Sequence, residues 1–489
     1  MADRDIPGSP PEPDFDPETL DRAVIARPLA QKLAEVGEEV PLPVVLELEL
    51  DYPDGREGAK ERVHEILESI RPGEADYIIH WRKSAFSSQS QFLYGRLTGE
   101  VIRTLVARAG VGERAPVRRV WLDFAIGPLT NFSFATVKAD AASRSFSAAG
   151  EGIVWAVMDS GVDATHPHFA MHRNLQLDGP LEHLDFTGEG GSIADPLVDE
   201  FGHGTHVAGT IAGERHATSR SPIQAWVRHR DGRQAVTYQR PEIAMISGMA
   251  PKTRILSLKV LDHKGGGLSS NLMAAIGYIQ ELNAYGRELM VHGVNMSVGY
   301  RFDAEWYACG HSPLCVEVDR LVRSGVVVVV AAGNTGYSKA TGGGLSLSIN
   351  DPGNAERAIT VGATHRDEPY RYGVSYFSSK GPTGDGRIKP DLVAPGERIL
   401  SCAAGAKRAQ IERALGANRV CQYLEDSGTS MAAPHVSGVI AAFLSIRREF
   451  IGRPERVKQI FLDSASDLGR DRYLQGHGLV DLMRAIQSV

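Results

Sequence analysis

The hydrophobic pattern from Glu151 onward predicts buried strands that alternate with helices. Continuous apolar runs, which suit strands buried on both faces, occupy residues 153–158, 255–260, 294–298, 326–332 and 359–361. Between these runs, the sequence predicts helices at residues 271–285 and 316–323. Apolar strands separated by helices predict an α/β fold with a mostly parallel sheet that is covered on both faces.

The N-terminal part of the chain carries a different pattern. Residues 1–16 are rich in proline and acidic residues and predict a disordered tail, and residues 17–39 predict an amphipathic helix. The sequence then predicts, in this order, a strand, a helix, two strands, a helix and a strand at residues 43–52, 59–70, 77–81, 91–97, 100–109 and 117–124. That order is typical of a small ferredoxin-like α+β fold. We expect a tail and helix over 1–40, a small domain over 41–127 and a large domain over 128–489.

Composition narrows the range of functions. The chain has 489 residues, 42% of them hydrophobic, which is enough for a large core. Its net charge of −7 gives no indication of a nucleic-acid partner. The first residues lack a basic-then-apolar secretion signal, and no apolar run approaches the ~18 residues that a membrane span needs. We therefore expect a cytoplasmic protein without membrane contact.

The chain has four cysteines, Cys309, Cys315, Cys402 and Cys421, whose spacing fits no zinc-binding template. Two local bridges, Cys309–Cys315 and Cys402–Cys421, would suit an oxidising compartment, whereas all four cysteines stay thiols in a reducing one. Because no secretion signal is evident, we expect thiols.

Three distant stretches place an acid, a base and a nucleophile beside small residues. Asp159 lies in Val-Met-Asp-Ser-Gly, His203 in His-Gly-Thr-His-Val-Ala-Gly and Ser430 in Gly-Thr-Ser-Met-Ala-Ala-Pro. Alone, such stretches are common as turns or helix caps. Together, in the order Asp, His, Ser, they match one of the known chain orders of a serine-nucleophile triad.

The chemistry of acyl transfer explains these residue types. A serine hydroxyl attacks a carbonyl group once a neighbouring base removes its proton. We expect His203 to be that base and Asp159 to hold its imidazole in the correct tautomer. Asn334 follows an apolar run and, with the backbone N–H of Ser430, could donate hydrogen bonds to the developing oxyanion. His203 and His206 could also suggest a metal pair, but the adjacent glutamate of the zinc-peptidase helix is missing.

With these stretches, the chain from about Thr136 onward resembles the subtilisin-like serine peptidases. The likeness extends to Gly-Met-Ala-Pro at 248–251, Lys-Val-Leu at 259–261 and Asn-Met-Ser-Val-Gly at 295–299. It also covers residues 377–382, 389–396 and 476–481. The resemblance implies the three-layer subtilisin-like fold, with Asp159, His203 and Ser430 as the triad and Asn334 as the oxyanion donor. It further implies that the N-terminal domain is a propeptide that chaperones folding and blocks the active site. If this domain is cleaved off, the cut should fall between about Phe124 and Ala135. The alternative is an unrelated small α+β appendage.

The resemblance also implies which residues bind an extended peptide substrate. Two segments flank the peptide: Gly265, Gly266 and Gly267 on one side, and Ser297, Val298 and Gly299 on the other. The pocket for the fourth residue before the cut is lined by Ser269, Leu272 and Val298. The primary pocket is bounded by Ala331, Ala332 and Gly333. Glycine allows a substrate backbone to approach closely, although three glycines in a row are also typical of a flexible loop. Ser269 is small where many relatives carry an aromatic residue, which predicts an open, apolar pocket.

Two segments depart from the family pattern. Residues 214–247 replace a short Asn-rich loop that commonly binds calcium, and residues 225–239 predict a β-hairpin. We therefore expect no tight calcium site and no required cofactor. The sequence does not decide whether a weaker calcium site is present. Residues 402–426 are longer than expected and predict a helix at 407–415. Both insertions are expected near the cleft, where they would narrow access to it.

The function implied is a serine endopeptidase that cuts protein or peptide substrates and carries its own inhibitory N-terminal domain. The alternative is a catalytically silent zymogen or regulatory binding protein, which that domain holds inhibited.

Overall fold

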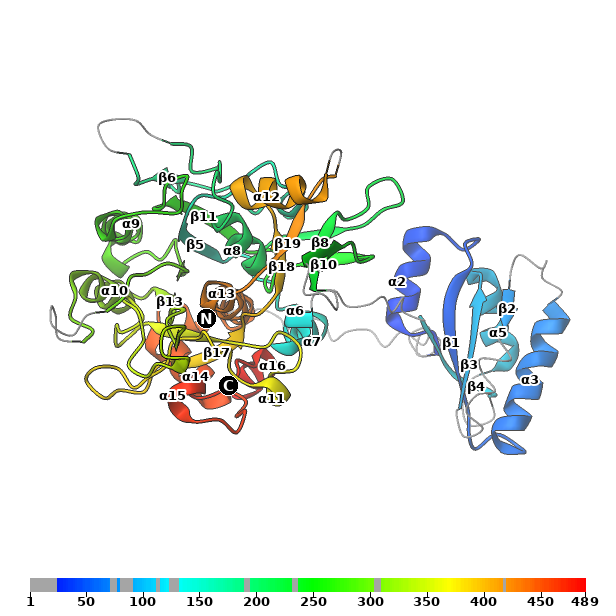
Figure 1. The fold of residues 1–489 in the computed structure, drawn as a ribbon. Helices are drawn as coiled ribbons and strands as arrows, with labels where there is room; N and C mark the ends of the chain where they lie inside the picture. The colour runs from blue at the N-terminus through cyan, green and yellow to red at the C-terminus, as the bar shows by residue number, and fades with distance from the viewer. Residues whose placement is uncertain are drawn as a thin grey trace, which may run out of the picture. The chain divides into compact units, whose positions relative to one another are not determined.

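The computed structural model divides the chain into two compact units, Met1–Ile126 and Gly127–Val489 (Figure 1). It describes residues 24–70, 77–79, 91–110, 115–122, 132–188, 194–230, 236–302, 309–416 and 419–489. The division falls one residue before the boundary predicted from the sequence. The predicted tail at 1–16 lies outside the described residues, as does most of the predicted processing segment, apart from the helix α6 (Phe132–Thr136).

The N-terminal unit has the predicted order of strands and helices. Its elements are α2 (Arg27–Val36), β1 (Leu42–Leu48), α3 (Gly55–Ile70), β2 (Tyr77–Ile79), β3 (Phe92–Leu97), α5 (Gly99–Ala109) and β4 (Val117–Leu122). The strands lie in the order β2-β3-β1-β4, and every neighbouring pair is antiparallel. This topology is the ferredoxin-like arrangement. Side chains alternate between buried and half-buried along β1, so one face of the sheet packs on α3 and α5.

The second unit is built on a seven-stranded sheet. Its strands are β5 (Val154–Asp159), β6 (Leu184–Asp185), β11 (Arg254–Lys259), β12 (Gly293–Met296), β13 (Val327–Ala331), β16 (Ile359–Thr364) and β17 (Leu392–Pro395). They lie in the order β17-β16-β13-β12-β5-β11-β6, and all neighbouring pairs are parallel. The chain moves from β11 on one side of β5 to β12 on the other. Ligands of open parallel sheets bind at such a reversal of strand order, beside the carboxyl ends of the strands.

Successive residues of the buried strands face opposite sides of this sheet. Val327 and Val329 of β13 pack in the cluster that contains α8 (Gly204–Ile211) and α13 (Thr429–Ile446). Val328 and Val330 pack in a second cluster, with α9 (Ser269–Leu282) and α10 (Pro313–Arg323). The continuous apolar runs of the sequence therefore reflect burial on both faces, which confirms the predicted three-layer fold.

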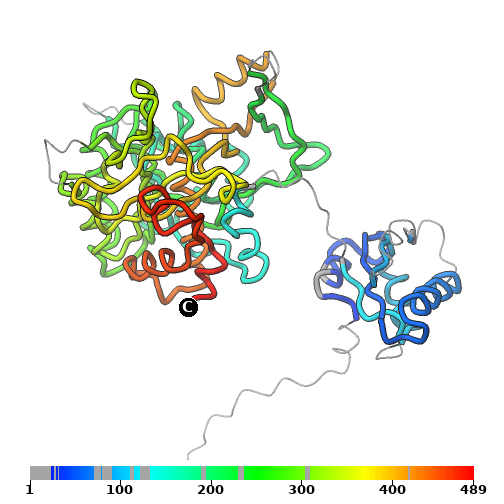
Figure 2. The backbone as a smooth tube through the Cα atoms, turned by 60° about the horizontal axis from the view of Figure 1, so that its bottom comes forward, coloured from blue at the N-terminus to red at the C-terminus, as the bar shows by residue number. Residues whose placement is uncertain are grey.

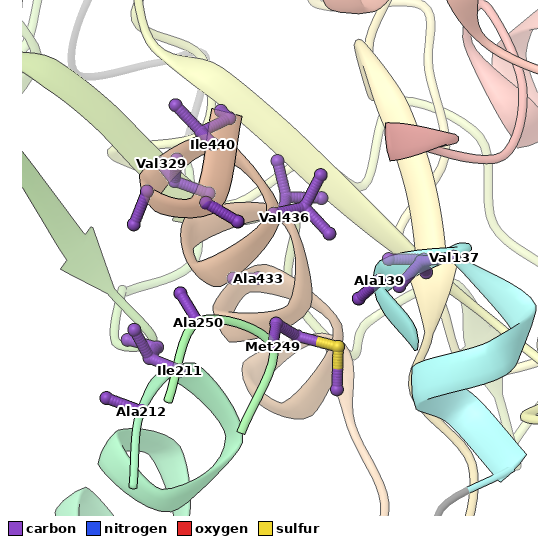
Figure 3. Packing of buried hydrophobic residues seen from close by; sticks show 14 of the residues in the cluster. Val137, Ala139, Ile211, Ala212, Met249, Ala250, Val329, Ala433, Val436 and Ile440 are labelled. Carbon is purple, nitrogen blue, oxygen red and sulfur yellow. The ribbon is translucent and has the colours of Figure 1, made fainter. Parts of the chain in front are cut away.

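Helix α13 lies at the centre of the first cluster. Ala433, Val436 and Ile440 project from it among residues of α8 and β13 (Figure 3). The helix has 18 residues with a mean hydropathy of 1.4, so it is long and apolar enough to cross a membrane, but 83% of it is buried within the protein. It is therefore a core helix. A nucleophile at its start rests on one of the most deeply packed elements of the fold.

Two predicted elements end earlier than expected, for local reasons. The predicted strand 294–298 ends at Met296 of β12, because Ser297 turns out of the sheet and bonds to the start of α13. The predicted helix 271–285 ends at Leu282 of α9. There the Asn283 side chain bonds to the backbone of residues 290 and 291, and Tyr285 has a left-handed φ of 55°.

The two insertions form one substructure. The predicted hairpin is present as β8 (Ala225–Arg230) and β9 (Val236–Gln239). It joins β19 (Tyr423–Asp426) and β18 (Ile399–Cys402) in a four-stranded sheet, ordered β18-β19-β8-β9. The predicted helix is α12 (Gly405–Leu415). Side chains from both insertions share a small apolar cluster that includes Trp226, Ile411 and Leu424. The segments run close together in both views of the backbone (Figures 1 and 2).

All four cysteines are buried free thiols, and neither of the two bridges considered from the sequence forms. Burial raises the pKa of the Cys421 thiol to about 12, and that of Cys402 well above its ordinary value. The Cys402 sulfur instead packs against Gly209 of α8. These cysteines therefore behave as small apolar core residues.

Four buried histidines should make the fold sensitive to acid. Burial lowers the pKa of His166, His206 and His435 to about 4 and that of His168 to about 3. An unfolded histidine titrates near pH 6.5, so the unfolded chain binds more protons below that pH. Stability is thus full above pH 6.5 and falls as the pH drops toward 4. We expect urea unfolding of Ser430→Ala protein to show several kcal/mol less stability at pH 5 than at pH 7.

A variant separates these histidines from other acid effects. His435→Leu removes one titrating group from α13 and should reduce the pH dependence by roughly 2 kcal/mol. An unfolding free energy that is the same at pH 5 and pH 7 would contradict this assignment.

Candidate active site

The acid and the base meet at the carboxyl end of the central strand. Asp159 is the last residue of β5, and His203 immediately precedes α8. The His203 Nδ1 atom lies 2.8 Å from Asp159 Oδ1 and 2.9 Å from Oδ2. Burial opposes charge on the imidazole, but the charge and hydrogen bonds of Asp159 outweigh it, so the pKa of His203 is raised. This pair leaves Nε2 free to accept a proton.

A second carboxylate holds the loop that carries His203. Asp199 is buried and accepts hydrogen bonds from the Ser160 hydroxyl and the Gly202 N–H through Oδ1, at 2.8 and 2.7 Å. Its Oδ2 accepts from the Thr205 N–H and hydroxyl, at 2.8 and 2.7 Å. Four hydrogen-bond donors, from residues that precede and follow His203 in the chain, therefore converge on the Asp199 carboxylate. No local sequence pattern singled out Asp199.

Ser430 lies in the first turn of α13 and lines the same cleft as His203. Its hydroxyl donates to the Ser297 carbonyl oxygen at 2.9 Å, and in the described part of the chain no hydrogen bond joins it to His203. Rotation about χ1 moves a serine hydroxyl between staggered positions. Catalytic hydrogen bonds often form only when substrate is bound. The structure thus brings His203, which is paired with the buried Asp159, and Ser430 to one cleft, with Ser430 turned toward Ser297.

A polar network fixes the backbone at Ser430. The Ser297 hydroxyl donates to the Ser430 carbonyl oxygen at 2.8 Å, and Asn295 Nδ2 donates to the Ser297 hydroxyl oxygen at 2.9 Å. The Ser437 hydroxyl, two turns along α13, donates to Asn295 Oδ1 at 2.9 Å. Because Asn295 and Ser437 are buried, this network ties β12 to α13 at the nucleophile.

Asn334 is held in one orientation. Its Oδ1 atom accepts from the Thr429 N–H at 2.9 Å and from the Thr429 hydroxyl at 3.1 Å. The Nδ2 donors therefore point away from these bonds. They lie near Gly428, where an added Cβ would be 3.2 Å from Nδ2. The N–H of Ser430, in the first turn of its helix, has no acceptor in the preceding turn. Both N–H groups are available to an oxyanion.

These groups open onto a cleft of about 540 Å³. Among the predicted substrate-binding residues, those that line it are Gly265, Gly266, Gly267, Ser269, Leu272, Ser297, Val298, Gly299, Ala331 and Gly333. Ala332 does not line it, because its side chain is fully buried in the core. The sequence missed Phe201, whose ring packs on Gly265. It also missed Asn350, which packs against Gly333 and lines the cleft with a polar side chain.

The segment at the position of the family's calcium loop does not fit that metal. Calcium takes six to eight oxygen ligands. After Gly213 the chain instead pairs β7 (Glu214–His216) with β10 (Met245–Ser247), and the Glu214 carboxylate bonds to His172 and His216. Within the described residues, no three acidic, histidine or cysteine side chains gather as they would around a metal ion.

The His203–Asp159 pair predicts the acid limb of activity. Hydrolysis needs a neutral imidazole, and the pKa of His203 is raised above its ordinary value of 6.5. The value of kcat/KM should therefore fall tenfold per pH unit on the acid side, with its midpoint above pH 6.5. A peptide substrate assayed between pH 5 and 9 measures this limb. A rate that stays flat below pH 6 would contradict the role of His203.

Comparisons with known proteins agree with this geometry. The sequence model of the Subtilase family matches residues 150–478. The chain is 28% identical to the serine protease AprX of Bacillus subtilis over 386 residues, which cover 77% of this chain and 76% of that protein. It is 32% identical to pyrolysin of Pyrococcus furiosus over 59% of this chain and 21% of pyrolysin. It is 28% identical to an intracellular serine protease of Paenibacillus polymyxa, over 68% and 80% of the two chains.

Proposed function

This chain belongs to the subtilase family and is a serine endopeptidase, and we propose that Asp159, His203 and Ser430 are its catalytic triad. The observation that supports this most directly is the pair of hydrogen bonds between His203 Nδ1 and Asp159, in the cleft that Ser430 lines. These bonds leave His203 Nε2 as the base that faces the cleft.

The reaction follows from the positions of these groups. Ser430 Oγ transfers its proton to His203 Nε2 and attacks the substrate carbonyl carbon, and the Asn334 Nδ2 and Ser430 N–H groups bind the resulting oxyanion. His203 then gives the proton to the leaving amine, and the acyl group stays on Ser430. Water, deprotonated by His203, hydrolyses the ester and restores the hydroxyl. His203 therefore accepts or donates the proton in each step.

We further propose that the N-terminal unit inhibits the peptidase unit until it is removed. Support comes from its separate hydrophobic core and its ferredoxin-like topology, which resembles that of subtilisin propeptides. A fluorophosphonate probe labels only an accessible, activated serine. Full-length protein should therefore label much more slowly than protein whose residues 1–130 are removed by an added protease after folding, and added N-terminal unit should slow the cleaved form again.

Two outcomes would change this proposal. Equal labelling of both forms would show that the N-terminal unit does not inhibit. An absence of labelling in both forms would favour the alternative of a silent binding protein. Ser430→Ala protein provides the blank for each form.

The pocket for the fourth substrate residue before the cut is expected to take large apolar side chains. Support comes from Leu272 and Val298, which the family resemblance assigns to this pocket and which line the cleft, and from Leu268, which lines the same cleft and is 60% exposed. Ser269 leaves the entrance open. In a peptide library, Leu or Phe at this position should be cleaved at least about tenfold faster than Asp, because the pocket buries apolar surface. A preference for a charged or small residue would contradict this proposal.

A further inference from the structure

The second insertion carries a lysine that reaches the surroundings of the triad histidine. Lys407, in the first turn of α12, forms an ion pair with Asp426 at the end of β19. Its Nζ atom also lies 5.6 Å from the centre of the Phe201 ring. The Phe201 ring is in turn 6.4 Å from the His203 ring, centre to centre. One cation thus contacts both the strand that leads to Ser430 and the loop that leads to His203.

The first turn of α12 is attached directly to the histidine loop. The Ala406 N–H donates to the Glu200 carbonyl oxygen at 2.8 Å, and the Lys407 N–H donates to the Phe201 carbonyl oxygen at 3.3 Å. The approach is close, because a Cβ on Gly202 would lie 2.1 Å from the Ala404 carbonyl oxygen. These backbone contacts therefore fix the position of the Lys407 backbone relative to the loop that carries His203.

Asp426 lies close to Ser430 along the chain, and it pairs with a strand residue that contacts His206. It lies four residues before Ser430, and its Oδ1 accepts from the Ser427 N–H at 2.8 Å. In β18, Ile399 pairs with Asp426, and the Ile399 carbonyl oxygen lies 3.0 Å from His206 Nε2. Burial opposes charge on this carboxylate, but Lys407 outweighs it, so the pKa of Asp426 is lowered. The Asp426 carboxylate is thus ionised at neutral pH.

The titratable groups that act on His203 come from four elements: Asp159 of β5, His206 of α8, Lys407 of α12 and Asp426 of β19. His206 is neutral at working pH, because burial lowers its pKa to about 4. Asp159 and Asp426 favour the imidazolium, and Lys407 disfavours it. The charges of Lys407 and Asp426 therefore act on His203 in opposite directions.

We propose that Lys407 is a positioning residue for catalysis, which balances the charge of Asp426 beside His203 so that Asp159 alone governs the imidazole. This inference deepens the proposed function and rests on it. Neither residue touches the reacting atoms. The ion pair of the insertion thereby adds little net charge beside His203, and the acid limb stays where Asp159 sets it.

The test uses paired charge removal in the full-length chain. Lys407→Met leaves the Asp426 carboxylate unbalanced and should move the acid limb of kcat/KM to higher pH by about half a unit. Asp426→Asn leaves the Lys407 cation and should move it to lower pH by a similar amount. The double variant should return close to the original midpoint. Lys407→Arg keeps the charge and should keep the midpoint.

Two further measurements are controls. One shows whether any loss of positive charge from α12 shifts the midpoint, and the other follows His203 without relying on hydrolysis. Arg408→Met removes the neighbouring cation of α12, which pairs with Glu412, and should leave the midpoint unchanged. An NMR titration of the His203 Nδ1 proton in Ser430→Ala protein reports the same shifts without needing hydrolysis, so an inactive enzyme would refute the proposed function but not this one. If the single variants shift in the same direction, or neither shifts, Lys407 does not balance charge at His203. Should Lys407→Met fail to fold, the Asp426→Asn shift still decides the sign.

Discussion

Replacement of Ser430 by alanine is expected to lower kcat about 10⁶-fold, the loss measured for the nucleophile in subtilisin, a relative of this chain. The variant keeps the cleft, the His203–Asp159 pair and the oxyanion donors, so KM should change little. The residual rate should still exceed that of the uncatalysed reaction, because binding and the oxyanion donors act without the nucleophile. Initial rates on a peptide substrate in enzyme excess measure both quantities.

A surface serine provides the control for this change. Ser324 follows α10, and its hydroxyl donates to the Leu321 carbonyl oxygen. Ser324→Ala should keep kcat within about twofold of the original, because this site is remote from the cleft. If Ser430→Ala retained even one per cent of the activity, Ser430 would not be the nucleophile.

Loss of the Asn334 amide donor should have the next largest effect. Asn334→Ala and Asn334→Asp are each expected to lower kcat by about 10²–10³, a magnitude again taken from subtilisin, with KM nearly unchanged. The reason is that the donor acts on charge that develops only in the transition state. The aspartate variant is the sharper test, because its carboxylate can still accept the two Thr429 hydrogen bonds that hold the side chain.

A second amide in the same cleft controls for loss of polarity. Asn350→Ala removes a side chain that lines the cleft and packs against Gly333. It should alter substrate preference and KM while kcat stays within about tenfold. If Asn334→Ala and Asn350→Ala lowered kcat by comparable factors, Asn334 would not be a specific oxyanion donor.

The sheet could be predicted from the sequence, and a triad could be proposed from it, because both leave local signals. Buried parallel strands are continuous apolar runs, and Asp159 and Asn334 follow such runs directly. The insertions were also recognised, since the hairpin and helix have their own periodicity. The N-terminal fold followed from the order of its elements alone. The cytoplasmic location stays a prediction.

Other parts of the site could not be predicted, because they depend on pairs distant in sequence. The Ser437–Asn295 bond joins residues 142 positions apart, and β8 pairs with β19 across a still longer gap in the chain. Three of the four donors to Asp199 are local, but the fourth, the Ser160 hydroxyl, comes from a residue 39 positions away. The orientation of Ser430 toward Ser297 is likewise a tertiary contact. Such contacts follow no period along the chain, so the sequence gives no signal for them.

The central claim is that His203 activates Ser430. Mass spectrometry of protein whose residues 1–130 are removed by an added protease after folding, and which is then treated with a fluorophosphonate, tests it most directly. The triad assignment predicts one adduct, on the peptide that contains Ser430, and its disappearance in the His203→Ala variant. An adduct on another serine, or labelling of Ser430 that proceeds at the same rate without His203, would contradict it.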